Sequence, residues 1–290
     1  MGESNMLHYM ILGKFPVLLL SQQKKRSYLV TAEDLIREPI SISKESTVHD
    51  GIEKIIDNRI SGLIIDAKNT QSWILSARDI GKILVSKNQN TKTVPISDIM
   101  QELTLVDQYA PIPNCAGMML AKKTNAIGIR GKNGIRGIIT KHDLVKHYHE
   151  NSDDAKKIQD VMTYGSFFVN DDASLYDGLA KMIATQVSRL LIKNSQDEPV
   201  GIVTFGNFLG KVFRYELDQS NVFADYGKRC KITDVMTKQI ITVTAQTSLP
   251  RIAKILLEYR IHGIAITNGR KIIGFVTEKD IIRELARQEI

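Results

Sequence analysis

A pattern that recurs four times constrains the fold of this 290-residue chain more than any single residue does. Each copy opens on a short Asp-containing segment and closes on a Thr or Ser that is followed three residues later by Asp or Asn. From the opening Asp to the closing Asp or Asn, the copies measure 45, 45, 47 and 46 residues. Such a constant period indicates one structural unit used four times. The openings are Asp34-Leu35-Ile36, Asp98-Ile99-Met100, Asp160-Val161-Met162 and Asp234-Val235-Met236, and the closings are Ser76 to Asp79, Thr140 to Asp143, Thr204 to Asn207 and Thr277 to Asp280.

The fourth copy shows which elements the unit contains. Its residues 240–244 are β-branched and predict a strand, and apolar residues at helical spacing follow. Residues 263–267 and 271–276 predict the two strands of a hairpin that turns at Asn268-Gly269 in type I′ geometry. A last helix is expected from Thr277 onward. Each unit has too few apolar faces to fold alone, so we expect units to pair in a mixed α+β or α/β fold.

The chain divides where its composition turns polar. Residues 149–157 are the expected boundary between two halves of two units each, and residues 214–229 are the expected long connector inside the second half. The expected organisation is an N-terminal extension and four repeats, at residues 1–30, 31–86, 94–149, 157–213 and 230–287.

An apolar stretch lies in the N-terminal extension, at residues 6–20. It is interrupted by Gly13, Lys14 and Pro16 and is shorter than the roughly 20 apolar residues that a membrane helix needs. A signal peptide places its positive charges before the apolar run, whereas here the basic residues 24–26 follow it. We interpret the segment as an extension that packs on the repeats, with attachment to a membrane surface or a partner as the alternative.

Composition narrows the function classes. The two cysteines, Cys115 and Cys230, are far apart and have no metal-binding spacing, which indicates neither a disulfide framework nor a zinc site and predicts a reducing, cytoplasmic environment. The net charge of +7 is spread along the chain without interleaved aromatic residues, so nucleic-acid binding is not the first expectation. Small ligands that carry phosphate suit the same charge.

The repeat resembles the CBS domain, over about residues 31 to 287. The segments that carry the resemblance are the Asp-Val-Met openings of the third and fourth copies, and the closings Gly-Ile-Ile-Thr-Lys-His-Asp at 137–143 and Gly-Phe-Val-Thr-Glu-Lys-Asp at 274–280. The resemblance implies that two repeats form a Bateman module and that four repeats form a flat disc, as in the gamma subunit of AMP-activated protein kinase. It also implies sensing of adenosine-containing molecules such as AMP, ADP, ATP or S-adenosylmethionine. The sequence leaves open whether one chain or a homodimer closes the disc.

The Thr/Ser-x-x-Asp closing has two interpretations. Ahead of an apolar helix it is close to a capping box, in which the hydroxyl and the carboxylate bind free backbone N–H groups. Alternatively, the carboxylate accepts hydrogen bonds from both hydroxyls of a ribose, and the hydroxyl and the helix N-terminus face a phosphate. The residues alone do not decide between them, whereas the resemblance favours ribose binding at Asp143 and Asp280.

Two departures distinguish the copies. Asn207 replaces the carboxylate in the third copy, which is therefore the position least expected to bind a ribose. Trp73 replaces the glycine that the other copies carry at Gly137, Gly201 and Gly274, and its indole is expected either to fill the cleft or to stack on a base. We therefore expect two good clefts, one doubtful cleft at Asp79 and one poor cleft.

The resemblance implies that the two repeats of a module share each cleft. The expected ribose contacts are Asp280, Thr277, Asp143, Thr140, Asp79 and Ser76. The expected base and backbone pocket comprises Thr163, Phe167, Val187, Ser188, Ile40, Ile60, Ser61, Gly62, Thr104, Asn125 and Ala126, although packing in the core would explain each of these equally. The expected phosphate contacts are Arg189, His262, His142 and Lys279, for which a solvated surface role is the alternative. At position 262 the kinase subunit carries arginine, so the histidine suits a less phosphorylated ligand.

The expected function is regulatory and not enzymatic. The sequence shows no nucleophile beside a base, no metal-ligand constellation and no P-loop, so we assign no catalytic residue, no metal and no required cofactor. An adenine nucleotide (AMP, ADP or ATP) is the expected regulatory ligand, and the protein partner is unknown. The alternatives are a structural adaptor with empty clefts and a basic nucleic-acid-binding regulator.

Overall fold

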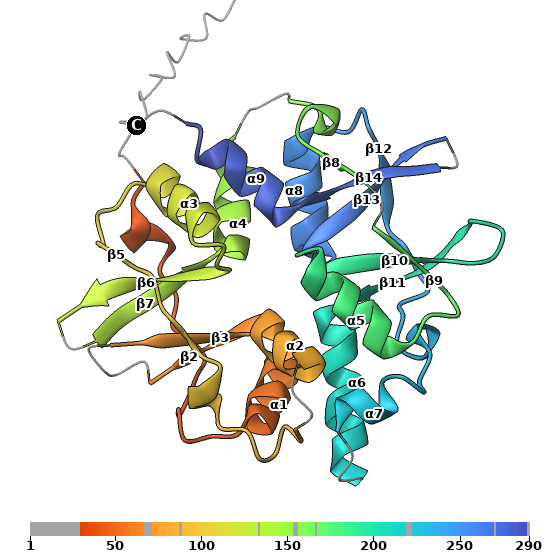
Figure 1. Ribbon diagram of the computed structural model, residues 1–290. Coiled ribbons are helices and arrows are strands. Elements are labelled where there is room, and N and C mark those ends of the chain that lie inside the picture. Colours follow the sequence, from red (N-terminus) through yellow and green to blue (C-terminus); the bar gives the residue numbers. More distant parts are fainter. Residues whose placement is uncertain are drawn as a thin grey trace, which may run out of the picture.

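The computed structural model describes residues 30–66, 71–86, 89–132, 134–152, 156–165, 167–218, 222–269 and 271–288 (Figure 1). The apolar stretch at 6–20 and the role expected for it lie outside these residues. Repeat 1 contains η1 (Ala32–Leu35), β1 (Ser41–Ile42), α1 (Val48–Asn58), β2 (Gly62–Ile65), β3 (Trp73–Ser76) and α2 (Ala77–Ser86). Repeat 2 contains η2 (Ile96–Asp98), β4 (Gln101–Glu102), β5 (Leu105–Val106), α3 (Ile112–Ala121), β6 (Ala126–Gly131), β7 (Gly134–Thr140) and α4 (Lys141–Asn151).

The second half repeats the same order of elements. Repeat 3 contains η3 (Ile158–Asp160), β8 (Thr163–Tyr164), β9 (Phe168–Asn170), α5 (Leu175–Ala184), β10 (Arg189–Lys193), β11 (Pro199–Thr204) and α6 (Phe205–Asp218). The short helix α7 (Phe223–Tyr226) leads to repeat 4, which contains η4 (Ile232–Asp234), β12 (Thr242–Thr244), α8 (Leu249–Glu258), β13 (Gly263–Asn268), β14 (Lys271–Thr277) and α9 (Glu278–Leu285). None of the helices among these described residues is both long and apolar enough to span a bilayer.

Local sequence explains the hairpin of repeat 4. Strands β13 and β14 are antiparallel, with Gly263 opposite Thr277 and Asn268 opposite Lys271. The turn therefore begins one residue later than expected, because Asn268 still belongs to β13, and Gly269 adopts a positive φ of 60°. The first strand is shorter than expected, because regular pairing with β13 covers only Thr242–Thr244. The strand and helix order predicted for this copy is otherwise confirmed.

Two repeats pair by exchanging the segments at their openings. Gln101 of β4, from repeat 2, pairs with Ile74 of repeat 1, and Arg37 of repeat 1 bridges back to Ile138 of repeat 2. In the second half, Tyr164 of β8 pairs with Gly274 of repeat 4, and Thr237 of repeat 4 bridges back to Ile202 of repeat 3. Each half is therefore one module of two interlocked repeats.

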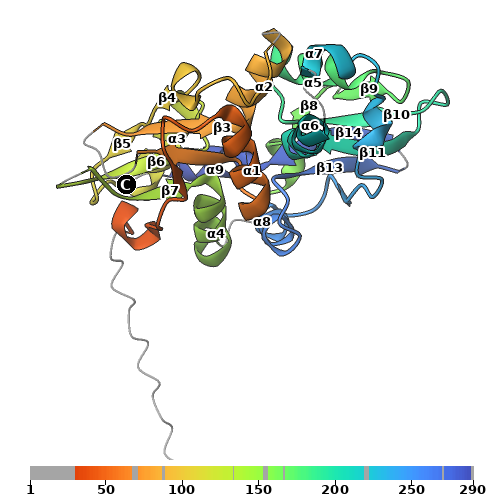
Figure 2. The same ribbon diagram turned by 90° about the horizontal axis from the view of Figure 1, so that it is seen from below.

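The core has two kinds of interface. Within a module, the sheets face each other through small apolar clusters, which are Ile64, Ile74, Leu103, Ala126 and Ile138 in one module and Leu191, Ala265 and Phe275 in the other. Between modules, the helices of repeats 1 and 3 bury one large cluster, and those of repeats 2 and 4 bury a second. The four repeats of a single chain thus form the predicted disc, which is round in Figure 1 and flattened in the perpendicular view of Figure 2.

The connector expected at residues 214–229 starts later than predicted, because α6 continues to Asp218, and it carries the short helix α7. The rings of Tyr215 and Tyr226 stack 4.0 Å apart, and Phe213 stacks on His49 of α1 at 4.9 Å. These aromatic contacts attach Phe213 and Tyr215 of α6 to other elements, and they were not visible from the polar composition of the segment. In the same way, α4 runs to Asn151 and so enters the polar stretch at 149–157.

Candidate functional site

Each closing motif forms a helix cap, as is clearest at the start of α9. The backbone N–H and the hydroxyl of Thr277 both donate to Oδ2 of Asp280, at 2.8 Å each. The second oxygen of this carboxylate, Oδ1, accepts from Nη1 of Arg283 at 2.8 Å. Asp280 is 2% exposed, so one buried carboxylate both caps the helix and pairs with a cation.

Repeats 2 and 1 have the same arrangement. Thr140 donates from its backbone and its hydroxyl to Asp143 Oδ2 at 2.8 and 2.6 Å, and Arg37 reaches Asp143 Oδ1 at 3.2 Å. Ser76 donates its hydroxyl to Asp79 Oδ2 at 2.5 Å, and Lys82 reaches Asp79 Oδ1 at 2.9 Å. The capping interpretation is therefore confirmed for all three carboxylates. Ribose binding stays a prediction, in which a diol replaces the cation at Oδ1.

Asn207 in repeat 3 is held differently. Its Oδ1 accepts from the backbone N–H and the hydroxyl of Thr204 at 2.8 and 2.9 Å, so an amide preserves the cap. Its Nδ2 donates to the backbone carbonyl of Val235 in repeat 4 at 3.0 Å, a bond that a carboxylate cannot make. Asn207 therefore joins repeat 3 to repeat 4.

Packing explains the glycines that occupy, in the other repeats, the position equivalent to Trp73. A Cβ at Gly201 would lie 2.5 Å from Sδ of Met236, and one at Gly137 would lie 2.5 Å from Cγ1 of Ile36. In both cases the opening segment of the partner repeat crosses the strand at this point. In repeat 1, Trp73 instead pairs with Glu102 of β4, and its half-buried indole packs against the core shared by repeats 1 and 3.

The first turns of the motif helices bring charged side chains together between the modules. The carboxylate of Glu278, the first residue of α9, lies between two histidines. Its Oε1 is 3.6 Å from Nδ1 of His142 in repeat 2, and its Oε2 is 3.1 Å from Nδ1 of His262 in repeat 4. Burial raises the pKa of the Glu278 carboxyl, but the contacts with His142 and His262 and the charge of these imidazoles lower it to about 2. The contact with Glu278 also raises the pKa of His142.

Arg189, the first residue of β10, is a buried cation at the same place. Its guanidinium packs directly over Gly263, in the space that a Cβ there would fill. Burial lowers the pKa of Arg189 to about 10, while the negative charges of Glu278 and Asp280 raise it. Its Nη2 donates to Ser188 Oγ at 3.3 Å, and its Nε has no hydrogen-bond partner among the described residues. Repeat 3 thus contributes a buried donor beside the motif of repeat 4.

Two further cations of this cluster were not predicted. Lys141 donates to Asn125 Oδ1 at 2.9 Å, and burial lowers the pKa of its ammonium group to about 8, against the attraction of Glu278. Arg78 donates to the backbone carbonyl of Gln186 in repeat 3 at 3.1 Å and also acts electrostatically on Lys141. Glu278, Lys141 and Arg78 all lie within two residues of the motif Thr or Ser. That position was the signal that could have identified them.

The remaining expected pocket residues lie at strand starts and strand ends. Thr163 of β8 pairs with Phe275 of β14, and Phe167 packs edge-on against the same ring at 5.4 Å. Ala126 starts β6 opposite Thr140, and its side chain lies in the cluster between the two sheets. Others pack on the core or supply backbone bonds: Ile40, Ile60 and Val187 pack on the core of repeats 1 and 3, Gly62 pairs with Ser76, and the carbonyls of Ser61 and Thr104 accept from Ala77 and Gly128.

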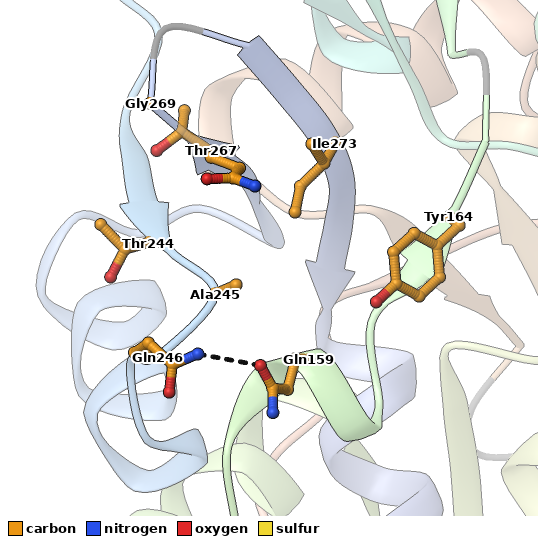
Figure 3. Close-up of a pocket in the computed structure, with 9 residues that line it drawn as sticks. Gln159, Tyr164, Thr244, Ala245, Gln246, Thr267, Gly269 and Ile273 are labelled. Atoms are coloured by element: carbon orange, nitrogen blue, oxygen red, sulfur yellow. Dashed lines mark hydrogen bonds between the residues drawn. The ribbon is translucent and has the colours of Figure 1, made fainter.

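Two open surface cavities lie away from these residues. One, of about 670 Å³, is formed by η3 and the hairpin end of repeat 4, where Gln159 bonds to Gln246 and Tyr164 stands at the rim (Figure 3). The other, of about 590 Å³, lies at the corresponding hairpin end of repeat 2, around Arg130 and Arg136. Neither is lined by an expected contact residue. No group of His, Cys, Asp and Glu within the described part of the chain could hold a metal ion.

Comparison with solved structures identifies the fold. The crystal structure of MJ1225 from Methanocaldococcus jannaschii, a proposed archaeal homologue of the AMPK gamma subunit, superimposes with a TM-score of 0.79 at 20% identity. The match covers 89% of this chain and all of that one. A conserved protein of unknown function from Pyrococcus horikoshii matches with a TM-score of 0.61 at 16% identity, over 88% of this chain and all of that one.

Sequence comparison gives relatives and a family. The uncharacterised protein MJ1404 of Methanocaldococcus jannaschii is 24% identical over 266 residues, which are 88% of this chain and 61% of that protein. An inosine-5′-monophosphate dehydrogenase of Nitrosopumilus maritimus is 28% identical over 56% of this chain but only 31% of the enzyme. The chain thus spans between about a third and three fifths of the length of these relatives. Residues 158–214 and 232–287, which are repeats 3 and 4, match the model of the CBS domain, so the second half of the chain is a pair of CBS domains.

Proposed function

We propose that this protein is a non-catalytic sensor that binds adenosine-containing ligands in clefts between its paired repeats. The observation that supports the proposal best is that the charge of Asp280 acts on the buried guanidinium of Arg189 from the neighbouring repeat. A carboxylate that suits a ribose diol lies on repeat 4, and a guanidinium with a free donor comes from repeat 3. Together they supply an acceptor for the sugar and a cation for an anionic tail within one module.

The proposed ribose contacts remain Thr277 with Asp280 and Thr140 with Asp143, and the site at Ser76 and Asp79 is the third candidate. Binding would require the ribose to take over Oδ1 of the carboxylate from its present cation, which is Arg283 at Asp280 and Arg37 at Asp143. Both cations are partly exposed while the carboxylates are largely buried, so a diol that replaces the cation must itself donate hydrogen bonds to Oδ1. The capping bonds to Oδ2 can remain in place.

Regulation would follow from the position of the clefts. The motif helices α2, α4, α6 and α9 also build the two interfaces between the modules. A ligand that binds one arrangement of these helices more tightly shifts the chain toward it. We propose that a protein partner, or a further domain in a longer relative, responds to that shift.

Calorimetric titration of the purified chain with adenosine, AMP, ADP and ATP tests the proposal. We expect saturable binding below millimolar concentration for at least one of these ligands. If none of the four binds at millimolar concentration, the carboxylates serve only as helix caps and the chain acts as an adaptor with empty clefts.

A further inference from the structure

Glu278 lies among the residues that are expected to contact phosphate. Two of these, His142 and His262, already contact its carboxylate, at 3.6 and 3.1 Å. The carboxylate also acts electrostatically on Arg189. The Glu278 side chain is only 10% exposed, so its charge is shielded from water and acts strongly on its neighbours.

The other acidic residues nearby have partners of their own. Asp280 pairs with Arg283, Asp143 with Arg37 and Asp79 with Lys82, and each of these carboxylates also caps its helix. Glu278 is the carboxylate of this cluster that neither caps a helix nor pairs with a cation of its own helix. Four cations face Glu278 from the surrounding elements: Lys141 and His142 of α4, Arg189 of β10, and His262, which immediately precedes β13. Lys279 follows Glu278 on α9, and Arg78 of α2 is close enough to act electrostatically on Lys141.

Glu278 also differs from the residues at the same position of the other repeats. The residue after the motif Thr or Ser is Ala77 in repeat 1, Lys141 in repeat 2 and Phe205 in repeat 3. None of these is acidic. Repeat 4 therefore contributes, besides the motif carboxylate Asp280, a second buried negative charge to a cluster of several cations.

We propose that Glu278 is an internal counter-anion that determines how many phosphates the clefts accept. The Glu278 carboxylate already interacts with the cations that would bind a phosphate chain, and it repels a second negative charge. The clefts at Asp280 and Asp143 would thus accept adenosine ligands with an uncharged or singly phosphorylated tail and reject di- and triphosphates. The adenosine part of this inference rests on the function proposed above, whereas the charge balance does not.

The test compares Glu278→Gln with the wild type, using inorganic tripolyphosphate, adenosine, AMP and ATP as separate probes in calorimetry. We expect Glu278→Gln to bind tripolyphosphate and ATP at least about tenfold more tightly than the wild type, with adenosine affinity unchanged. Glu284→Gln is the matched control, because it removes a buried negative charge from the same helix, where Glu284 pairs with Lys156 and Arg287. It is expected to give no gain.

The outcomes separate the two proposals. If adenosine binds but Glu278→Gln gains no more affinity for ATP and tripolyphosphate than Glu284→Gln does, the counter-anion role is wrong and the sensor function stands. If tripolyphosphate binding rises in Glu278→Gln while adenosine binds to no variant, the sensor function fails and the charge balance stands.

A second variant covers the case in which Glu278→Gln does not fold. The double variant Glu278→Gln with Lys141→Met removes one buried positive charge together with the negative one and leaves the four expected phosphate contacts in place. It is expected to show the same gain for tripolyphosphate, and a double variant that folds without this gain would overturn the inference.

Discussion

The Nδ1 atom of His142 lies 3.6 Å from Oε1 of Glu278, and this contact joins repeat 2 of one module to repeat 4 of the other. The helices that carry the two residues, α4 and α9, also pack against each other through the core of repeats 2 and 4. A titratable contact therefore lies directly at the interface between the modules.

This contact predicts a pH-dependent stability. The contact with Glu278 raises the pKa of His142 above its ordinary value, so the stability that this contact contributes is full below about pH 6.5 and is lost as the pH rises through the raised pKa. Urea unfolding of the wild type and of His142→Gln should differ most near pH 6 and converge above about pH 8.

His147 on the same helix is the matched control. Burial lowers its pKa, so the wild type should lose stability relative to His147→Gln as the pH falls below about 6.5, which is the opposite trend. A difference between wild type and His142→Gln that does not vary with pH would show that the ion pair contributes nothing to stability.

Asn207→Asp should destabilise the protein by about 1–3 kcal/mol, although aspartate is the residue found in the other three motifs. The substitution removes the bond from Nδ2 to the carbonyl of Val235 and places a carboxylate oxygen against it. Urea unfolding measures the effect. Asn170→Asp, at an exposed position of β9 in the same repeat, is the control and should change stability by less than about 0.5 kcal/mol. Equal effects at the two positions would contradict the structural role given to Asn207.

Gly137→Ala should cost about 1–3 kcal/mol, because the new methyl group would lie 2.7 Å from the backbone carbonyl of Arg37 and 2.5 Å from Ile36. Gly117, in the middle of α3, has no atom within 4 Å of an added Cβ. Gly117→Ala should therefore stabilise the protein by about 0.5–1 kcal/mol. Thermal unfolding distinguishes the two, and a tolerated Gly137→Ala would show that the opening of repeat 1 does not pack as described.

Much of this fold could be predicted from the sequence, because the repeat period, the hairpin of repeat 4 and the capping motifs have local signals, although the turn of that hairpin starts one residue later than predicted. The extension of α6 into the connector at 214–229 could not be predicted, since the stacking of Tyr215 on Tyr226 depends on tertiary packing. The interlocking of the modules likewise depends on contacts between distant segments.

The candidate site, like the fold, could be predicted from the sequence only in part. The carboxylates of the motifs were identifiable from their spacing. The role of Glu278 was not, because it depends on His142, 136 positions earlier in the chain, lying beside it in the fold. The buried state of Arg189 also required the structure, since the sequence does not show that Gly263 makes room for its guanidinium.

Titration of Asp280→Asn with adenosine and AMP, beside the wild type, tests the central claim most directly. An amide at this position keeps the helix cap, as Asn207 demonstrates in repeat 3, so the variant should fold, with a lower melting temperature because it loses the ion pair with Arg283. The account predicts at least about tenfold weaker binding in the variant, because the cap uses the amide oxygen and the remaining NH2 group donates where the ribose hydroxyls need an acceptor. Unchanged ligand affinity in a folded Asp280→Asn would contradict it and leave Asp280 with a structural role alone.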